Sequence, residues 1–272
     1  MKSKTVRVVA SISLLLVLGF AFSCIKKTIP IPPPVPTSVT LKNGLLLYLP
    51  FNGTVADSSG NNNPSVIIDS AGGGLTTDQH GNPNSAWGSN GTGAYVRVTN
   101  NGSIRYDSAF SVSFNVMVSS NNLVRQAFLC FDNTANAYGP GIATGLTIPY
   151  QTNYFFGVQD STAGCDNVGS YITKLSDTSS FSPQGGVWYN IINVYENGTA
   201  YIYVDGQLIG TVDGSNIQPL NHNGLICPES TINIGYWWDQ DMESLNGKID
   251  EVRLYNRTLT LSEINSLAGK NQ

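Results

Sequence analysis

Apolar and polar residues alternate with a period of two along much of this chain. The segment Phe110–Val118 reads FSVSFNVMV, so every second residue from Phe110 is large and apolar. This alternation predicts a β-strand with one buried face. Similar runs predict further strands at residues 45–49, 94–99, 126–131, 153–158, 169–174, 187–195, 200–204, 207–210, 232–235 and 247–255.

Turn signals separate these strands at short intervals. Asn197-Gly198 joins two alternating runs, and Asp205-Gly206 joins the next two. Both pairs suit tight hairpins that need positive φ angles. The one helical signal is the capping box from Thr260 to Glu263, with Gly269 as its end. Short strands with regular turns predict an all-β antiparallel sandwich with a short C-terminal helix.

The N-terminal segment has the pattern of an export signal. Three basic residues precede an apolar stretch at 8–22, which is too short to span a bilayer comfortably and has no stop-transfer flank. Residues 1–23 are therefore predicted to be a signal peptide that is removed.

The stretch Ala21-Phe-Ser-Cys24 resembles a bacterial lipobox, in which the cysteine is diacylated and becomes the first mature residue. The alternative is an ordinary signal peptide with an incidental cysteine. A diacylated Cys24 would make the lipid anchor the only membrane contact. Ile25, in place of an aspartate, favours the outer membrane, with the domain facing the cell surface or the periplasm. Residues 24–40 form a proline-rich linker, and 41–272 one domain.

Composition limits the classes of function. Only 12% of the residues are charged and the net charge is −4, so the chain lacks the basic surface that nucleic-acid binding requires. Of four cysteines, three remain besides Cys24. Cys130, Cys165 and Cys227 allow at most one internal disulfide, and the sequence does not choose the pairing. Buried thiols without a disulfide fit equally well.

Three ordered stretches resemble one known family. They are LYLPFNGTVADSSGN at 47–61, the GVWYNI and AYIYVDG segments within 186–206, and LNGKIDEVRLYNRTLTLSEI at 245–264. Together they resemble the laminin-G-like jelly rolls of the concanavalin A-like lectin and glucanase superfamily, here on a bacterial lipoprotein of the Bacteroidetes type. The resemblance implies a two-sheet antiparallel jelly-roll sandwich with one concave sheet and with its first and last strands adjacent.

Several motif residues also have structural interpretations. Phe51 and Tyr255 are expected in the core, and Trp188 is expected to be an aromatic residue of the sandwich core. Gly53 and Gly247 are expected in turns. These expectations can be checked directly by burial and backbone angles.

A cation site is one functional hypothesis. Asp250 interrupts an apolar strand, where a carboxylate must be paired, hydrogen-bonded or metal-bound. The resemblance implies a structural calcium ion at Asp250, with Asp57 as a second ligand because the first and last strands are adjacent. The alternative is that Asp57 caps its own turn and that Asp250 pairs with Arg253 or Lys248.

The second functional hypothesis concerns the loop YWWDQDME that begins at Tyr236. Its Asp239-Gln-Asp241 resembles the calcium loop of pentraxins. Exposed aromatic rings suit sugar faces, so we expect this loop to bind carbohydrate. Alternatively, one or both tryptophans fold back against the sandwich. The predicted contacts are Tyr236, Trp237, Trp238, Asp239 and Asp241.

Catalysis has weaker support. The spacing Asp239-x-Asp241-x-Glu243 is similar to the acidic run of laminarinase-type glycosidases, but it lies late in the chain and does not begin with Glu. The only histidines, His80 and His222, have no nucleophile motif nearby. The glycines at 72–74 are expected in a loop that lacks the lysine and helix of a phosphate site.

The sequence therefore predicts a non-catalytic, calcium-stabilised lipoprotein of the cell surface that binds a glycan or glycoprotein. A structural or adhesion module that binds protein is the alternative, and a glycoside hydrolase is the third.

Overall fold

The computed structural model describes residues 40–105, 109–119, 125–133, 141–146, 154–161, 171–178, 181–213, 230–237 and 244–269. The chain divides into Met1–Thr37 and Ser38–Gln272. The predicted signal peptide, Cys24 and the linker up to residue 39 lie outside the described residues. Among the described residues, no helix has the length and hydropathy needed to cross a membrane.

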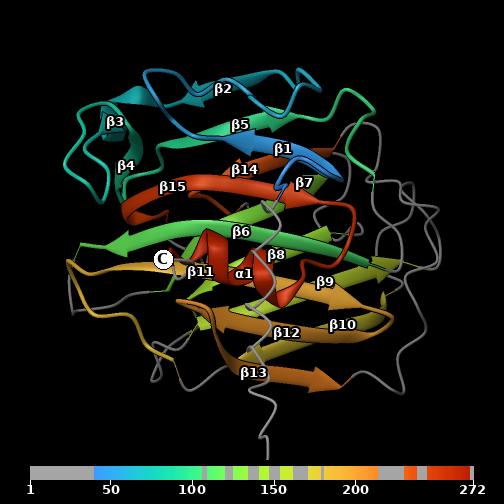
Figure 1. Ribbon diagram of the computed structural model, residues 1–272. Coiled ribbons are helices and arrows are strands. Elements are labelled where there is room, and N and C mark those ends of the chain that lie inside the picture. The colour runs from blue at the N-terminus through green and yellow to red at the C-terminus, as the bar shows by residue number, and fades with distance from the viewer. Residues whose placement is uncertain are drawn as a thin grey trace, which may run out of the picture. The chain divides into compact units, whose positions relative to one another are not determined.

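Two antiparallel sheets form the domain (Figure 1). In the first sheet the strand order is β13-β12-β11-β6-β15-β4-β3, and β1 pairs with β15 outside this path. The bounds in chain order are β1 Leu45–Leu49, β3 Gly73–Thr76, β4 Ala86–Asn90, β6 Ala109–Val118, β11 Trp188–Glu196, β12 Thr199–Val204, β13 Gln207–Asp213 and β15 Asn246–Tyr255.

The second sheet has the order β10-β9-β8-β7-β14-β5-β2. Its strands are β2 Ser65–Ile68, β5 Tyr95–Thr99, β7 Gln126–Asn133, β8 Gly141–Leu146, β9 Tyr154–Ser161, β10 Tyr171–Thr178 and β14 Ser230–Ile234. A short 3-10 turn, η1, covers Ser70–Gly72, and one helix, α1, covers Leu261–Leu267.

The main core fills the space between the two sheets. All five large apolar residues that alternate along β6, from Phe110 to Val118, are fully buried in it, as the sequence predicts. The opposite face of β6 differs from the prediction, because Ser111, Ser113 and Asn115 are buried as well. β6 is a central strand flanked by β15 and β11, so side chains of both neighbours shield its second face.

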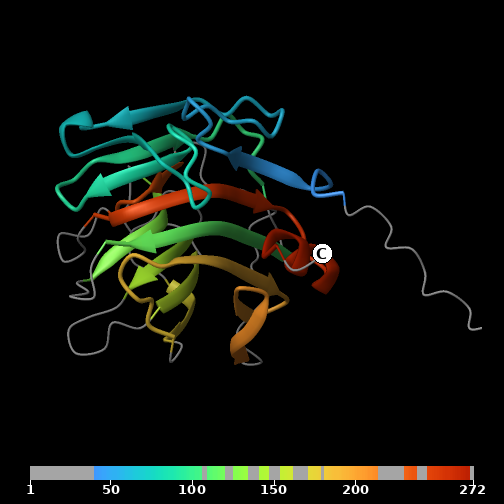
Figure 2. The ribbon, with the colours of Figure 1, turned by 60° about the vertical axis from the view of Figure 1, so that its left-hand side comes forward.

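The adjacency of the first and last strands is confirmed, because β1 pairs antiparallel with β15. The hairpin prediction is also confirmed: Asn197 and Gly198 have φ angles of 47° and 90°. At the C-terminus, Thr260 and Glu263 form the reciprocal capping box of α1, and Gly269 follows the helix with a φ of 70°. Figures 1 and 2 show α1 lying against the first sheet.

Strands without alternation were not predicted. β2, β3, β4 and β8 are four to six residues long, and three of them contain glycine. The loop expected at 72–74 is wrong in part, because Gly73 and Gly74 begin β3. The β4 strand supplies Trp87, a fully buried indole of the core.

Two structural roles expected from the sequence are wrong. Trp188 is only half-buried and lies outside the core clusters, whereas its neighbour Tyr189 packs against the core. Gly247 is not a turn residue but lies within β15, where a Cβ atom would come within 2.1 Å of the Met117 carbonyl oxygen. Phe51 is fully buried in the core, and Gly53 has a φ of 74°, as expected.

Candidate functional site

Side chains on the outer face of the first sheet, which points away from the main core, line up in rungs across β15, β6 and β11. The pairing register places Asp250 opposite Asn115, and Asn115 opposite Asn190. Asn190 continues the row to Asp205, because its backbone N–H donates to Asp205 Oδ1 at 2.8 Å and its carbonyl accepts from Asp205 N–H at 2.8 Å. We call Asp250, Asn115, Asn190 and Asp205 the polar rung.

Members of the polar rung form hydrogen bonds with one another, but one buried oxygen atom of the rung has no partner among the described residues. Asn190 Nδ2 donates to Asn115 Oδ1 at 2.8 Å, which leaves Asn190 Oδ1 buried with no hydrogen-bond partner among the described residues. Ser113, on the next rung of the same face, is 1% exposed, and its Oγ likewise has no partner in the described part of the chain. A buried polar atom without a partner costs about 1–3 kcal/mol, so two such atoms side by side need an explanation.

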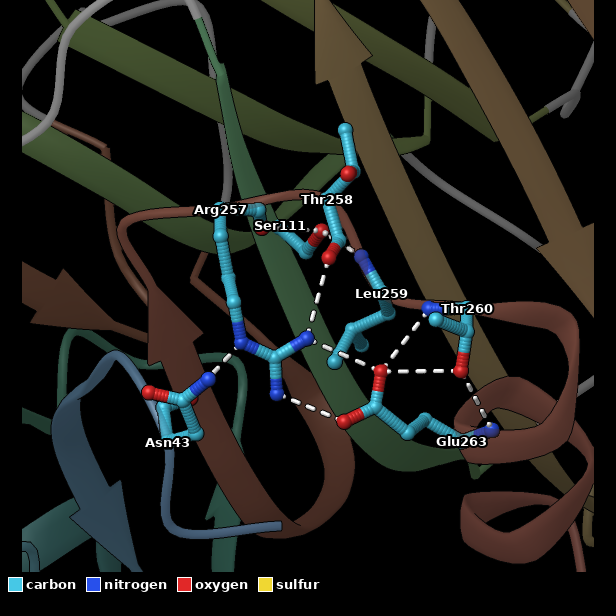
Figure 3. A network of polar contacts seen from close by, with 7 residues as sticks. All are labelled: Asn43, Ser111, Arg257, Thr258, Leu259, Thr260 and Glu263. Carbon is cyan, nitrogen blue, oxygen red and sulfur yellow. Dashed lines mark hydrogen bonds and ion pairs between the residues drawn. The ribbon is translucent and has the colours of Figure 1, made fainter. Parts of the chain in front are cut away.

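Ser111 provides the contrast on the same strand and face. Its Oγ donates to the Arg257 carbonyl at 2.9 Å and accepts from Leu259 N–H at 3.1 Å (Figure 3). Both partners lie in the segment that leads into α1. The helix segment therefore satisfies Ser111, whereas the hydroxyl of Ser113, two residues further along, has no partner among the described residues.

The same segment is held by an ion pair. Both Arg257 terminal nitrogens donate to the Glu263 carboxylate, at 2.8 Å and 2.6 Å, and Arg257 Nε donates to the Asn43 carbonyl at 2.8 Å (Figure 3). The Arg257 hydrogen bonds hold the pKa of Glu263 below its usual value, against the opposing effect of burial. A charged, bidentate pair of this kind fixes the position of the helix on the sheet.

Longer side chains flank the polar rung on both sides. On one side lie Trp188, Met117 and Lys248, and Lys248 Nζ donates to Thr77 Oγ1 at 2.7 Å. On the other side the Arg253 guanidinium lies 4.2 Å from the centre of the Tyr48 ring.

Arg253 also forms an ion pair with Glu251, and the Tyr48 hydroxyl donates to Glu251 at 3.0 Å. Burial raises the pKa of Tyr48 to about 12, so this hydroxyl stays a donor at physiological pH. The two cations that flank the polar rung, Arg253 and Lys248, are thus already bound by neighbours.

Asp57 performs the turn-capping role that the sequence left as the alternative to a metal ligand. Its Oδ1 accepts from the Tyr48 and Ser59 N–H groups, and its Oδ2 accepts from the Ser59 hydroxyl and from the backbone and side chain of Asn63. Burial would raise the pKa of Asp57, but these hydrogen bonds outweigh it and lower the pKa. Five donors aimed at one carboxylate do not fit a cation.

Asp250 is buried at 4% exposure and accepts one hydrogen bond, from Glu251 N–H at 2.7 Å. The alternative pairing does not occur, because Lys248 binds Thr77 and Arg253 binds Glu251. Burial raises the pKa of Asp250 to about 7, and the nearby charges of Glu251 and Asp78 act in the same direction.

The described surroundings of Asp57 and Asp250 do not form a cluster of acidic metal ligands. Among the described residues, no group of three or more His, Cys, Asp or Glu side chains could hold a metal. The neighbouring Asp78 carboxylate is occupied by donors from His80 and Asn82. Calcium at Asp57 and Asp250 therefore stays a prediction from the sequence, and no chemistry is derived from it.

The predicted sugar-binding loop begins at the end of β14, in the second sheet. The Tyr236 ring stacks on Tyr95 with centroids 4.5 Å apart and planes 13° apart, and Arg97 lies 5.4 Å from the Tyr95 centroid. Tyr236 and Trp237 are both half-buried. Trp238, Asp239, Asp241 and Glu243 lie outside the described residues.

The disulfide pairing among the three remaining cysteines also stays open. Cys130 is buried in β7 and its thiol donates to the Phe131 carbonyl at 3.2 Å. Cys165 and Cys227 lie outside the described residues.

Asp250 was expected from the sequence to be a functional residue, whereas the other members of the polar rung were not. The signal was present, because polar residues at 111, 113 and 115 alternate with the apolar residues of β6. Alternation was interpreted as one buried and one exposed face. Only the pairing of β6 with β11 and β15 shows that these polar residues share a buried face with Asn190 and Asp250.

Solved structures with the same fold are mostly binding domains. Domain 4 of AbnA, an extracellular GH43 arabinanase from Geobacillus stearothermophilus, was solved in complex with arabinotriose. It is 20% identical with a TM-score of 0.58, over 82% of this chain and 98% of that one.

Two toxin domains are similar to the same degree. The binding domain of Paraclostridial Mosquitocidal Protein 1 is 16% identical with a TM-score of 0.60, over 84% of this chain and 52% of that one. A structure of botulinum neurotoxin type C, whose cell entry depends on two ganglioside molecules, is 19% identical with a TM-score of 0.59, over 85% of this chain and 52% of that one. The chain thus spans about half the length of the toxin structures it matches.

These identities show a shared fold. A comparison with curated protein sequences gave no match. A family profile described as the concanavalin A-like lectin/glucanases superfamily, of laminin-G type, matches residues 90–265, which is more than half of the chain. The two antiparallel sheets with a single short helix among the described residues agree with that profile. The chain therefore belongs to the concanavalin A-like lectin/glucanases superfamily.

Proposed function

We propose that this protein is a non-catalytic carbohydrate-binding module that captures a glycan or a glycoprotein. The observation that carries the proposal is the stacked pair of Tyr95 and Tyr236, followed directly by the half-buried Trp237. Stacking on Tyr95 holds Tyr236 in a fixed orientation, and the residue is only half-buried. Rigid aromatic rings of this kind match the apolar C–H faces of sugars at little cost in conformational entropy.

The solved structures support the same class of function without fixing the ligand. The arabinanase domain is in complex with arabinotriose, and the neurotoxin type C structure concerns ganglioside binding. The superfamily includes both lectins and glucanases, so the fold alone does not decide between binding and hydrolysis. The acidic run at 239–243, on which the glycosidase hypothesis depends, lies outside the described residues.

The test is a glycan array probed with the full chain in detergent, followed by calorimetry on the strongest ligand. We expect binding that Tyr236→Ala weakens about five- to thirtyfold, because the lost contact is worth on the order of 1–2 kcal/mol. Release of reducing sugar from the ligand, abolished by Glu243→Gln, would instead establish a glycosidase. An array without any signal would overturn the proposal.

A protein ligand is the second candidate, and one observation favours it. Val66 and Ile67 on the edge strand β2 are 51% and 39% exposed, which gives this edge adjacent apolar side chains. The binding domain of botulinum neurotoxin DC, solved in complex with rat synaptotagmin II, is 19% identical with a TM-score of 0.56. Binding to a glycoprotein that survives enzymatic removal of its glycans would favour this candidate.

We also propose that Cys24 anchors the protein to the outer membrane and that the linker carries the domain away from the bilayer. The support is the sequence pattern around Cys24. Labelled palmitate should be incorporated into the wild-type chain and not into Cys24→Ala. Digestion of the domain by protease added to intact cells would show that it faces outward.

A further inference from the structure

The outer face of the first sheet contains an arrangement that the proposed function has not used. Ser113 Oγ and Asn190 Oδ1 are buried oxygen atoms without a hydrogen-bond partner among the described residues. They lie on adjacent rungs of β6 and β11, two strands that pair directly. Folding must compensate for burying them, unless a bound molecule supplies the missing bonds.

We propose that this face is a second glycan-binding site, in which Ser113 and Asn190 accept hydrogen bonds from the hydroxyl groups of a neutral sugar. This inference rests on the proposed function and adds a location and a class of ligand to it. Asn190 Oδ1 is an acceptor, and a serine hydroxyl both accepts and donates. A sugar carries many hydroxyl donors at short intervals, so one residue of a glycan can meet both oxygens.

Trp188 supplies the apolar contact that such a site requires. It lies two residues from Asn190 on the same face of β11, and it is half-buried rather than part of the core. An indole beside hydrogen-bonding side chains suits a sugar ring, which is apolar on its faces and polar at its edge. Trp188 lies outside the core, contrary to the expectation from the sequence, because the register of β11 places it on the outer face.

Charge around the polar rung favours a neutral ligand. The carboxyl groups of Asp250 and Asp205 lie at its two ends, and Glu251 follows Asp250 directly. The flanking cations already bind Glu251 and Thr77 through Arg253 and Lys248. A uronic acid or a sulfated sugar would therefore meet three carboxyl groups against two cations, one of which, Arg253, is already paired with Glu251.

A ligand can reach the two oxygen atoms only if neighbouring side chains move. Ser113 Oγ and Asn190 Oδ1 have almost no exposed surface in the protein without ligand. Met117 and Lys248 lie on the rung next to the polar rung and have flexible side chains. Ser113 pairs with Arg253 and Ile192, so a ligand that reaches both oxygens must also displace a side chain on that rung.

The experiment measures affinity by calorimetry with the full chain in detergent, using the strongest neutral oligosaccharide from the glycan array and linear oligogalacturonate as the acidic comparison. Ser113→Ala should weaken binding of the neutral ligand about three- to tenfold, the effect of one neutral hydrogen bond. Trp188→Ala should weaken it at least about tenfold, and Trp188→Phe should restore part of the loss. Urea unfolding of each variant checks that the fold is intact.

Ser111→Ala is the matched control, because Ser111 lies on the same strand and face and is already satisfied. It should leave affinity unchanged. If a glycan binds and Tyr236→Ala weakens it while Ser113→Ala and Trp188→Ala match the wild type, this site is overturned and the proposed function stands. If oligogalacturonate binds more tightly than the neutral oligosaccharide, the proposal of a neutral ligand is overturned. Absence of any glycan binding overturns both proposals.

Discussion

The outer face of the first sheet is built in two different ways along the same three strands. At one end, Ile192 and Val194 of β11 and Tyr255 of β15 form a second apolar cluster with Leu259 and Ile264, beneath α1. We call this end the helix half. Beyond this cluster lie Ser113, which pairs with Ile192, and then the polar rung, and we call Ser113 and the polar rung the polar half.

The segment that covers the helix half supplies hydrogen-bond partners to polar groups of the sheet beneath it. In the helix half, Ser111 binds backbone atoms of residues 257 and 259, and Glu263 binds Arg257. The Tyr255 hydroxyl is the exception, since it is buried with no partner among the described residues. In the polar half, side chains of similar burial lack such partners, as Ser113 and Asn190 show. The helix half stabilises the fold, whereas the polar half retains hydrogen-bonding capacity for a ligand.

The largest expected effect comes from opening the helix half. Ile264 is 1% exposed, so Ile264→Ala should lower the free energy of unfolding by about 2–5 kcal/mol, through lost transfer energy and a cavity. Urea denaturation measures this change. Leu261→Ala is the control, because Leu261 lies on the same helix at 64% exposure and should cost little. Equal losses for the two variants would mean that α1 does not seal this half.

A pH-dependent effect is expected in the polar half. Burial raises the pKa of Asp250 from 3.8 to about 7, so the folded state holds a proton that the unfolded state releases between these values. Stability should therefore fall as the pH rises from about 4 to about 7 and stay lower above it, by at most about 4 kcal/mol. Asp250→Asn removes this dependence, and it should be more stable than the wild type at pH 8 but not at pH 4.

Urea denaturation at both pH values, with and without calcium, tests this expectation. A wild type that calcium stabilises at pH 8, beside a variant that calcium leaves unchanged, would instead support the calcium ligand predicted from the sequence. A variant that is less stable than the wild type at pH 8 in the absence of calcium would show that the ionised carboxylate has a stabilising partner.

The same comparison shows how far the sequence predicts this molecule. The helix half follows from local rules, since a capping box and a terminal glycine define α1, and both are as expected. The last strand and its pairing with β1 follow from the resemblance at 47–61 and 245–264. These features depend on residues close together in the chain or on a family pattern.

The polar half could not be predicted in the same way. Asn115 and Asn190 are 75 residues apart, and only strand pairing brings them within 2.8 Å. Trp188 and Tyr189 are consecutive aromatic residues, and only the register of β11 decides which of them enters the core. A shift of one residue would exchange their faces. Position in the sheet, which the sequence does not show, therefore determines the site.

The smallest expected effects give the sharpest test of the comparison, because they come from one substitution at two equivalent positions. Ser111→Ala should cost about 1–3 kcal/mol of unfolding free energy, since it leaves the Leu259 N–H and the Arg257 carbonyl without the hydroxyl that binds them. Ser113→Ala removes a hydroxyl that binds nothing among the described residues, so its cost should lie within about 0.5 kcal/mol of zero or be slightly favourable. Urea midpoints of the two variants, without ligand, measure the difference. If Ser113→Ala costs as much as Ser111→Ala, its hydroxyl serves the fold, and the polar half is stabilised by its own contacts rather than kept available for a ligand.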